Sequence, residues 1–454
     1  MNKISICIVI KIKSMGAKSS KNVQLTRKEY FSGEERQRVL QMLQKLSKGS
    51  DTIVVSVLQK HISSHLTTET ATKLIGILTK GRNIVSFPCS LAADNLGPLL
   101  KGSLEERLFL TLTLAGGGQA GVDCNSVIKY TEVILSSYLR IINDQSGYRG
   151  WKLDSANTVS QISRALLQDL LFSGCSLKEI WGKPPPEAQF SYDDFEQWCL
   201  GYSVFATMEA EVLKNCFCFS PVNCGALMPQ ATQLPKTFTS MLSAAQVMFL
   251  NSALPSVLQS EWRFLFSTTS HGWSFSIFMK QIVGRGPTLL VVEDQSGNKF
   301  GGFASVSWEV RPQFHGTPEC FLFALEPQAG IFHSTGYNRN FMYLNYLEKN
   351  TMPNGLGMGG REELFGLWLD YDFGKGLVAP TCTTFHSPQL SRHQELEICG
   401  VEVWALGAEE KDSDEEEGTR KQKSALDRNP EARAMMDLIG RERVSDGYRE
   451  EVKD

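Results

Sequence analysis

The sequence predicts an α+β protein with a helical first half and a β-sandwich in the second half. Apolar residues recur at helical spacing up to about residue 220, whereas alternating apolar residues and glycine pairs recur between Trp262 and Trp404. The apolar faces of this many strands must be buried, and two antiparallel sheets packed face to face are the natural way to bury them. The 454 residues are enough for about three folding units.

The composition is that of a soluble globular protein. Hydrophobic residues make up 42% and charged residues 21% of the chain, and the formal net charge is -3. This balance provides no broad basic surface, so we expect no nucleic-acid partner. The eleven cysteines include no CxxC pair, which favours buried, reduced thiols in a reducing compartment. The apolar run at residues 4–12 is too short to span a membrane.

Residues 1–30 are predicted to form a disordered head. Within it, residues 15–20 fit the N-myristoylation pattern M-G-x-x-x-[ST], with lysines nearby to meet anionic lipid. The pattern works only if Met15 is the true start, and residues 1–14 look like an upstream extension. We therefore expect lipidation at Gly16, and the alternative is a chance match in an unstructured segment.

Residues 31–220 are predicted to form a helical, EF-hand-like region. Capping boxes at Ser32 and Ser103 begin two of its helices. Residues 115–126 lie between two helical patterns, as a calcium loop does, but they offer only the carboxylate of Asp123. Because calcium needs several oxygen ligands, we expect the plan of an EF-hand without calcium binding.

Two histidines raise the question of a metal site in this region. His61 and His65 have the spacing of two zinc ligands on one helical face, but Ile62 replaces the glutamate of the HExxH motif. The cysteine cluster that begins at Cys216 matches no common zinc ligand set. We interpret the histidines as polar residues on an exposed turn, and we expect no metal, cofactor or catalytic residue.

Residues 221–237 are rich in Pro, Gly and Gln and are predicted to be a linker. Short helices are expected over residues 246–258, before the first strand. The alternation of apolar residues over 275–279 predicts a strand, and residues 289–308 predict a hairpin. Further strands are expected up to Val403.

Two motifs suggest a kinase but lack its context. Residues 355–360 satisfy GxGxxG and residues 372–374 read DFG, yet no strand lysine, helix glutamate or HRD-type loop lies between them. We predict a flexible loop or tight turn for the glycine run.

Cys382 precedes His386 by four residues, and we interpret this pair as structural packing rather than as a nucleophile and its base.

A set of short motifs in the β-rich region has a distinctive order and spacing. Its members are Trp262, His271, Gly272, Trp273, Ser274, Phe275, Gly301, Gly302, Phe303, Gly366, Leu367, Trp368, Asp370, Glu402 and Trp404. Together these motifs closely resemble the TLDc domain, over residues 238–407. The resemblance implies a β-sandwich flanked by helices that has no established catalytic residues and binds the cytosolic V-ATPase. It also implies a link to oxidative-stress resistance or to lysosomal signalling.

The tail is predicted to comprise an acidic, disordered spacer at 408–428 and an amphipathic helix at 429–447. Asn429 suits the N-cap and Pro430 the first helical position. An isolated helix of this length is marginal in water, so it either folds back on the sandwich or binds a partner. Our hypothesis is that this helix binds the V-ATPase at a second site, in addition to the site bound by the TLDc domain. Its apolar stripe is Ala432, Met435, Met436, Leu438 and Ile439.

Two functions from different classes follow from these features. The first is a non-enzymatic regulatory or adaptor protein on the cytoplasmic face of the lysosomal membrane and in the cytoplasm. There an N-terminal lipid is expected to contact the membrane. The resemblance implies that the TLDc domain binds V-ATPase subunits and that the chain supports mTOR signalling. The alternative is a thiol-based redox or oxidative-stress-protection activity at Cys382 or Cys399, which requires an exposed cysteine of low pKa. We favour the first function.

Overall fold

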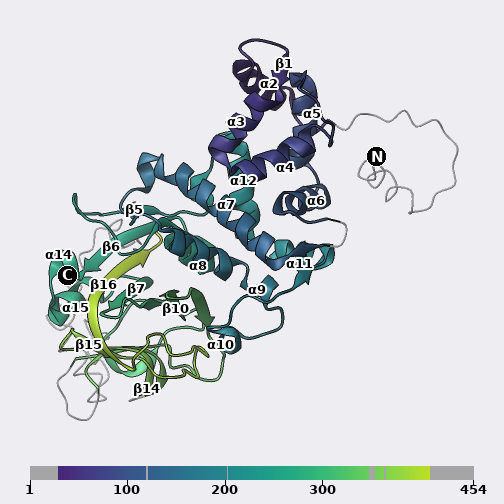
Figure 1. The fold of residues 1–454 in the computed structure, drawn as a ribbon. Helices are drawn as coiled ribbons and strands as arrows, with labels where there is room; N and C mark the ends of the chain where they lie inside the picture. Colours follow the sequence, from purple (N-terminus) through teal and green to yellow (C-terminus); the bar gives the residue numbers. More distant parts are fainter. Residues whose placement is uncertain (1–28, 119–120, 202, 347–352, 362–363, 409–454) are drawn as a thin grey trace, which may run out of the picture. The chain divides into compact units, whose positions relative to one another are not determined.

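The computed structural model describes residues 29–118, 121–201, 203–346, 353–361 and 364–408 (Figure 1). These residues form two compact units. The first unit takes the described residues up to 146, together with 155–174 and 184–227. The second takes 147–154, 175–183 and the described residues from 228 onward. Gly16 and the helix expected at 429–447 lie outside the described residues.

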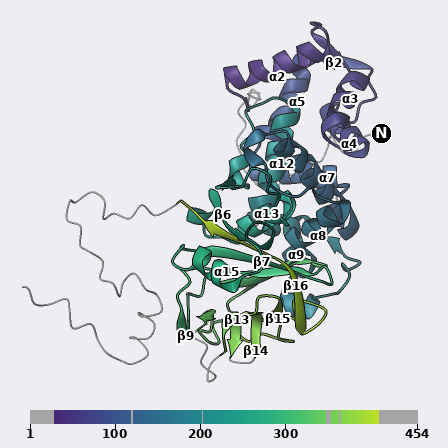
Figure 2. The same cartoon turned by 90° about the vertical axis from the view of Figure 1, so that its left-hand side faces the viewer.

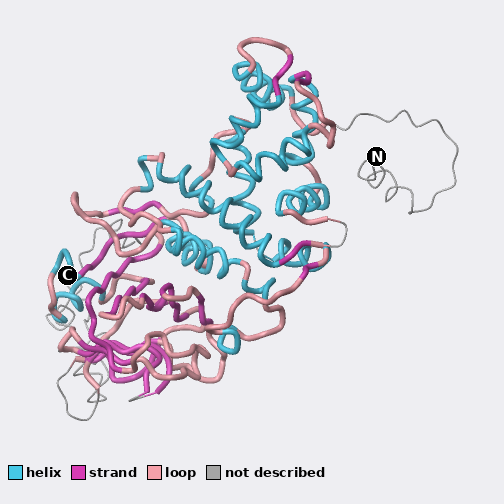
Figure 3. Tube along the Cα trace, in the orientation of Figure 1, coloured by secondary structure: helices cyan, strands magenta, loops and turns pink. Residues whose placement is uncertain are grey.

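The first unit is helical, as predicted for this half of the chain (Figure 3). Its helices are α2 (Gly33–Leu46), α3 (Val55–His65), α4 (Thr68–Leu78), α5 (Cys89–Lys101), α6 (Leu104–Ala115), α7 (Cys124–Asn143), α8 (Ala156–Leu166), α9 (Gln168–Leu171), α11 (Tyr192–Gly201), α12 (Ser203–Cys216) and the short 3-10 helix η2 (Cys224–Ala226). Its strands are β1 (Thr52–Val54), β2 (Ser86–Pro88), β3 (Val122–Asp123) and β4 (Gln189–Phe190).

Short antiparallel strand pairs connect the helices of the first unit. β1 lies between α2 and α3, β2 lies between α4 and α5, and the two strands pair with Ile53 opposite Phe87. β3 lies between α6 and α7 and pairs with β4. This is the helix–strand–helix plan expected from the sequence. Asp123 caps α7, because its carboxylate accepts a hydrogen bond from the backbone N–H of Ser126 at 3.0 Å.

The second unit carries most of the strands. They are β5 (Gln230–Thr232), β6 (Glu261–Ser267), β7 (Thr288–Asp294), β8 (Lys299–Ala304), β9 (Arg311–His315), β10 (Phe321–Glu326), β11 (Gly330–His333), β12 (Met342–Asn345), β13 (Gly355–Arg361), β14 (Leu364–Asp370), β15 (Lys375–Leu377) and β16 (Glu395–Leu406). Its helices are α10 (Leu177–Ile180), α13 (Ala244–Ala253), α14 (Thr268–His271), α15 (Phe275–Ile282) and the 3-10 helix η3 (Ser256–Leu258).

The long strand β16 belongs to two groups of strands. One group has the order β5–β6–β16–β7–β8–β10–β11, and the other has the order β16–β15–β14–β13–β12–β9. Residues 395–397 of β16 pair with β15, whereas the residues from Ile398 onward pair with β7 and, from Glu402, also with β6. Figure 2 shows β16 running from one group to the other. Nearly all pairings are antiparallel; β5 and β6 are parallel.

The two groups of strands pack face to face, which confirms the predicted sandwich. One buried cluster contains Leu322 and Phe300 from the first group and Leu356 and Leu367 from the second. The layers are so close that a Cβ atom on Gly302 of β8 would lie 2.5 Å from the sulfur of Met358 on β13. Glycine on the facing strands therefore sets the distance between the sheets.

The segment expected to be a strand over residues 275–279 is instead the helix α15. The side chain of Ser274 caps it by accepting a hydrogen bond from the N–H of Ile277, and the buried residues are Phe275, Phe278, Met279 and Ile282. These four residues fall at i, i+3, i+4 and i+7, the period of one helical face. The alternation of apolar residues was misleading because Ile277, which completes it, is 40% exposed.

The glycine run is also different from its prediction, because it forms β13 rather than a loop. Six of its seven residues are buried, and it pairs with β12 and β14. Close neighbours explain the glycines: a Cβ on Gly357 would lie 2.4 Å from the ring of Phe365. The linker predicted at 221–237 likewise contains β5, which extends the first sheet.

Two short segments from the helical half of the sequence belong to the second unit. In residues 147–154, Trp151 packs against Trp262 and Trp404, with ring centroids 5.9 and 4.9 Å away. Asp154 accepts a hydrogen bond from the N–H of Ala245 at the start of α13, at 3.1 Å. In residues 175–183, Trp181 packs on Phe332 of β11 at 5.3 Å. We call these segments the two straps.

Replacement of Gly301 by alanine should destabilise the second unit by about 3 kcal/mol. The added Cβ would lie 1.9 Å from the carbonyl oxygen of Leu290 and 2.6 Å from the ring of Phe323, so the backbone must move. Tryptophan fluorescence can follow the unfolding, because seven of the eight tryptophans lie in this unit. Gly374→Ala is the matched control, since its Cβ would meet nothing within 4 Å. Equal melting temperatures for the two variants would contradict the expectation.

Candidate functional site

Most residues of the sequence motif form the interior of the sandwich. Trp262, Phe303 and Trp404 are fully buried, and the motif glycines on β8 and β14 lie at close contacts inside it. Trp273 is different, because its side chain is 49% exposed. The motif is therefore mainly a scaffold, and Trp273 is the large side chain that it presents to solvent.

The position of Trp273 is fixed by the residues on each side of it. α14 ends at His271, whose ring stacks on Phe264 and Phe266 with interplanar angles of 23° and 17°. Gly272 then turns the chain with a φ of 77°, a conformation that favours glycine. Ser274 begins α15 as its N-cap. Trp273 thus lies at a short, capped corner between two helices.

The DFG sequence is the turn between β14 and β15. Phe373 has a φ of 59° and its N–H donates to the carbonyl of Asp370 at 2.9 Å. Its buried ring contacts Phe278 at 4.8 Å and Trp273 at 6.0 Å between centroids. This phenylalanine anchors the turn in the aromatic core, which accounts for the motif without a kinase.

Three exposed apolar side chains belong to the segments that meet at Phe373, and we call them the aromatic patch after Trp273 and Tyr371. They are Trp273, Ile277 and Tyr371, which are 49%, 40% and 53% exposed. Trp273 directly precedes the N-cap of α15, Ile277 lies in the first turn of that helix, and Tyr371 lies in the turn that Phe373 anchors. Large aromatic residues held on a rigid base are typical of the centres of protein–protein interfaces. The arrangement can bind a protein surface.

A network of buried charged groups lies at the motif residue Glu402. The carboxylate accepts hydrogen bonds from the hydroxyl of Ser240 and the N–H of Met241, both at 2.7 Å. The ammonium of Lys299 donates to the carbonyl of Met241 at 2.8 Å and pairs with Glu326 at 3.2 Å. These bonds connect the residues before α13 to three strands of the first sheet, so the network is structural.

Burial raises the pKa of Glu402 from 4.5 to about 7, against the opposing effect of its hydrogen bonds. The unfolded chain loses this proton near pH 4.5, whereas the folded chain keeps it until about pH 7. The folded state therefore binds more protons in this window, and stability should fall as the pH rises through it.

We expect the free energy of unfolding to fall by about 3 kcal/mol between pH 4.5 and pH 8, relative to Glu402→Gln. The glutamine variant loses a hydrogen bond at every pH, so only the pH dependence reports the titration. Thermal unfolding followed by tryptophan fluorescence across this range measures it. Parallel profiles for the two proteins would show that Glu402 does not titrate in this window.

The thiols named in the redox alternative lack the features of nucleophiles. Cys382 is buried, and its sulfur lies where a Cβ on Gly359 would meet it at 2.7 Å. Burial raises the pKa of the Cys382 thiol and also that of Cys399. A reactive cysteine instead needs a lowered pKa. These observations support packing as the role of Cys382.

The first unit contains a buried carboxylate beside a small cavity. Glu209 accepts hydrogen bonds from Tyr130 at 2.6 Å and Thr111 at 2.8 Å, and burial raises its pKa. The cavity next to it measures about 40 Å³. Pockets for organic ligands have volumes of roughly 300 Å³ or more, so this cavity is too small for a cofactor.

The histidines expected on an exposed turn lie on the helix α3 instead. Both side chains are half-buried, and His61 forms a hydrogen bond to the carbonyl of Cys216 at 2.8 Å. Sequence reasoning missed this contact because 155 residues separate its members.

Among the described residues, no helix is both long and apolar enough to cross a membrane.

Comparison with known proteins identifies the class to which this fold and motif belong. Residues 236–407 match the TLDc domain. The chain is 38% identical over 367 residues to mouse MTOR-associated protein MEAK7, covering 79% of each chain. It is 33% identical over 443 residues to the human protein of that name, covering 92% of this chain and 96% of that one.

A second similarity covers a smaller share of the chain. Oxidation resistance protein 1 of Xenopus laevis is 34% identical over 170 residues, which is 37% of this chain and 19% of that protein.

The domain match and the long relatives show that the chain belongs to the TLDc family. Over most of its length it is similar to the relatives named MTOR-associated protein MEAK7.

Proposed function

We propose that the chain is a non-enzymatic regulatory or adaptor protein that binds the cytosolic part of the V-ATPase through its TLDc domain. It acts on the cytoplasmic face of the lysosomal membrane and supports mTOR signalling. The observation that carries the proposal is the aromatic patch on a rigid TLDc scaffold. The names of the long relatives support the mTOR pathway. The V-ATPase as partner rests on what the resemblance to the TLDc domain implies.

The aromatic patch is suited to be the centre of the interface. Trp273 rests edge-on against Phe373, so little side-chain freedom is lost when a partner covers it. Interfaces of this kind obtain most of their binding energy from a few such aromatic residues. The buried residues of the motif act indirectly, because they hold Trp273 and Tyr371 in place.

Replacement of Trp273 and Tyr371 by alanine should weaken binding to the V-ATPase by about 2 kcal/mol or more. Affinity purification from detergent-solubilised lysosomal membranes, with quantification of the pump subunits that follow the protein, measures this loss. Tyr337→Ala is the control, because Tyr337 is an exposed aromatic residue outside the patch at 78% exposure. Retention of the pump by the double variant would exclude the patch as the binding surface.

The membrane contact rests on the N-terminal motif. We propose that Gly16 carries a myristoyl group, whose membrane affinity is only about 10⁴ M⁻¹ and needs a second contact. Binding to a membrane-embedded pump supplies that contact. If the intact mass of the protein shows no acyl group, the proposed myristoylation of Gly16 is wrong.

The tail is proposed as a second arm on the pump. The apolar stripe from Ala432 to Ile439 would bind a groove of the partner, and the acidic spacer before it would set the reach. Deletion of residues 430–447 should reduce co-purification of the pump and leave the melting temperature of the sandwich unchanged. Unchanged pump binding, or a lowered melting temperature, would favour a helix that folds back on the sandwich.

Protection against oxidation is the second candidate function. The similarity to oxidation resistance protein 1 favours it, although that similarity covers only 37% of this chain. A direct thiol mechanism requires a cysteine that reacts quickly with peroxide at neutral pH. The raised pKa values of Cys382 and Cys399 favour a protective effect that does not use these thiols.

A further inference from the structure

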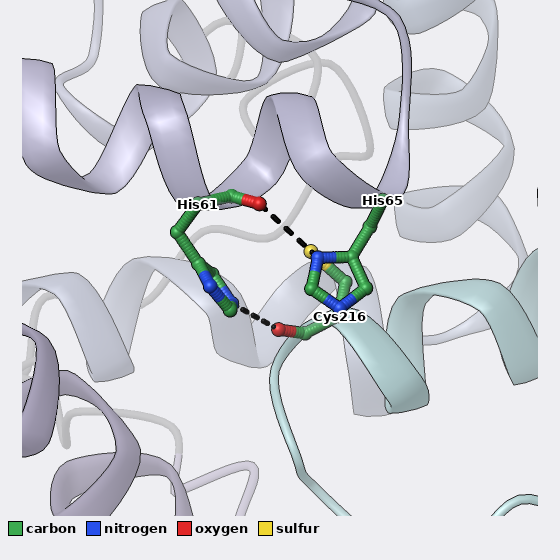
Figure 4. A group of neighbouring side chains, drawn as sticks. All are labelled: His61, His65 and Cys216. Carbon is green, nitrogen blue, oxygen red and sulfur yellow. Dashed lines mark hydrogen bonds between the residues drawn. The ribbon is translucent and has the colours of Figure 1, made fainter.

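Two imidazole rings and a thiol meet inside the first unit (Figure 4). His61 and His65 lie one turn apart on α3, and Cys216 is the last residue of α12. A nitrogen of each ring and the sulfur of Cys216 lie within 4.8 Å of one another. The ring centroids are 4.8 Å apart. Three side chains of the kind that bind transition metals therefore share one small volume.

Hydrogen bonds to the backbone fix the tautomer of each ring. The Nε2 atom of His61 is 2.8 Å from the carbonyl oxygen of Cys216, and the Nδ1 atom of His65 is 3.1 Å from the carbonyl oxygen of His61. A carbonyl oxygen can only accept, so these two nitrogens carry the protons. The other nitrogen of each ring keeps a free lone pair. Histidines that bind metals are commonly oriented in this way.

Burial favours the neutral ring of His65 and the protonated thiol of Cys216. Burial lowers the pKa of His65, and it raises that of the Cys216 thiol well above its usual value. Arg140 donates hydrogen bonds to the carbonyls of Ser64 and His65 at the end of α3, which fixes the backbone there. Neutral imidazoles need no deprotonation before they bind a metal.

We propose that His61, His65 and Cys216 bind one thiophilic transition-metal ion, with Zn²⁺ as the expected ion. Nitrogen and sulfur ligands select zinc over calcium or magnesium, which prefer oxygen. On binding, the sulfur–hydrogen bond breaks, a sulfur–metal bond forms, and one proton is released to solvent. The HExxH comparison did not suggest this site because the third ligand comes from a distant helix rather than from the motif.

Metal binding requires the two rings to turn, because the nitrogens that are hydrogen-bonded to the carbonyls carry protons. In a tetrahedral zinc site the ligand atoms are about 3.3–3.7 Å apart, so the cluster must contract by roughly 1 Å through side-chain rotation. Three protein ligands leave the fourth position for water or another group. The bound ion would join α3 to the end of α12, two helices that the chain separates by more than a hundred residues.

Cobalt and zinc binding to the full chain, purified without a histidine tag and treated with chelator, tests the site. One Co²⁺ per chain should produce a thiolate-to-cobalt charge-transfer band, and Zn²⁺ should displace it and raise the melting temperature of the first unit. His65→Asn should weaken zinc binding roughly tenfold or more. This variant keeps the hydrogen bond between His61 and Cys216, so the helices should remain packed.

Cys218→Ser is the matched control. Cys218 lies two residues beyond Cys216, is exposed, and stands outside the cluster. It should bind cobalt with the wild-type band, whereas Cys216→Ser should lose the band. Absence of the band in the wild-type chain would overturn the proposal. A band that survives in both His65→Asn and Cys216→Ser would also overturn it, since the metal would then lie elsewhere.

Discussion

The architecture of the second unit depends on one strand that belongs to both of its sheets. β16 pairs with β15 through its first residues and with β7 and β6 through its last ones. A register shift between Ile398 and Gly400 lies at the change of partners, and a side chain at Gly400 would press on Met241. Because backbone hydrogen bonds continue along the strand, the two sheets cannot separate without breaking it.

The same strand explains why buried residues matter for a surface function. Glu402 and Trp404 lie on β16, where they hold the residues before α13 and the first strap. The corner with Trp273 rests on β6 through the stacking of His271 on Phe266, and β6 pairs with β16. The pairing of β6 with β16 therefore helps to position the aromatic patch.

The class of fold and the capped helices could be predicted from the sequence because periodicity and capping are local properties. The errors arose where one local pattern fits two structures. Phe275 and Met279 alternate as in a strand, yet with Phe278 they also fit a helix, and the N-cap at Ser274 decides for the helix. In the glycine run Leu356 and Met358 alternate with glycines, and the glycines indicated a loop rather than the buried strand β13.

The candidate sites were harder to predict than the fold. The sequence motif includes Trp273, but the position of its side chain depends on contact with Phe373, in a turn about a hundred residues further along the chain. The contact between His61 and Cys216 depends on how α3 and α12 pack, which no local spacing encodes. Tertiary contacts of this kind require the three-dimensional structure.

The straps change what counts as a complete TLDc unit in this chain. The family similarity begins at residue 236, but Trp151 and Trp181 come from well before that point and cover Trp404 and β11. A fragment cut at the family boundary would expose a tryptophan cluster and one face of the terminal strand to water, where other chains could adhere. The evolutionary module and the folding module of this protein therefore have different limits.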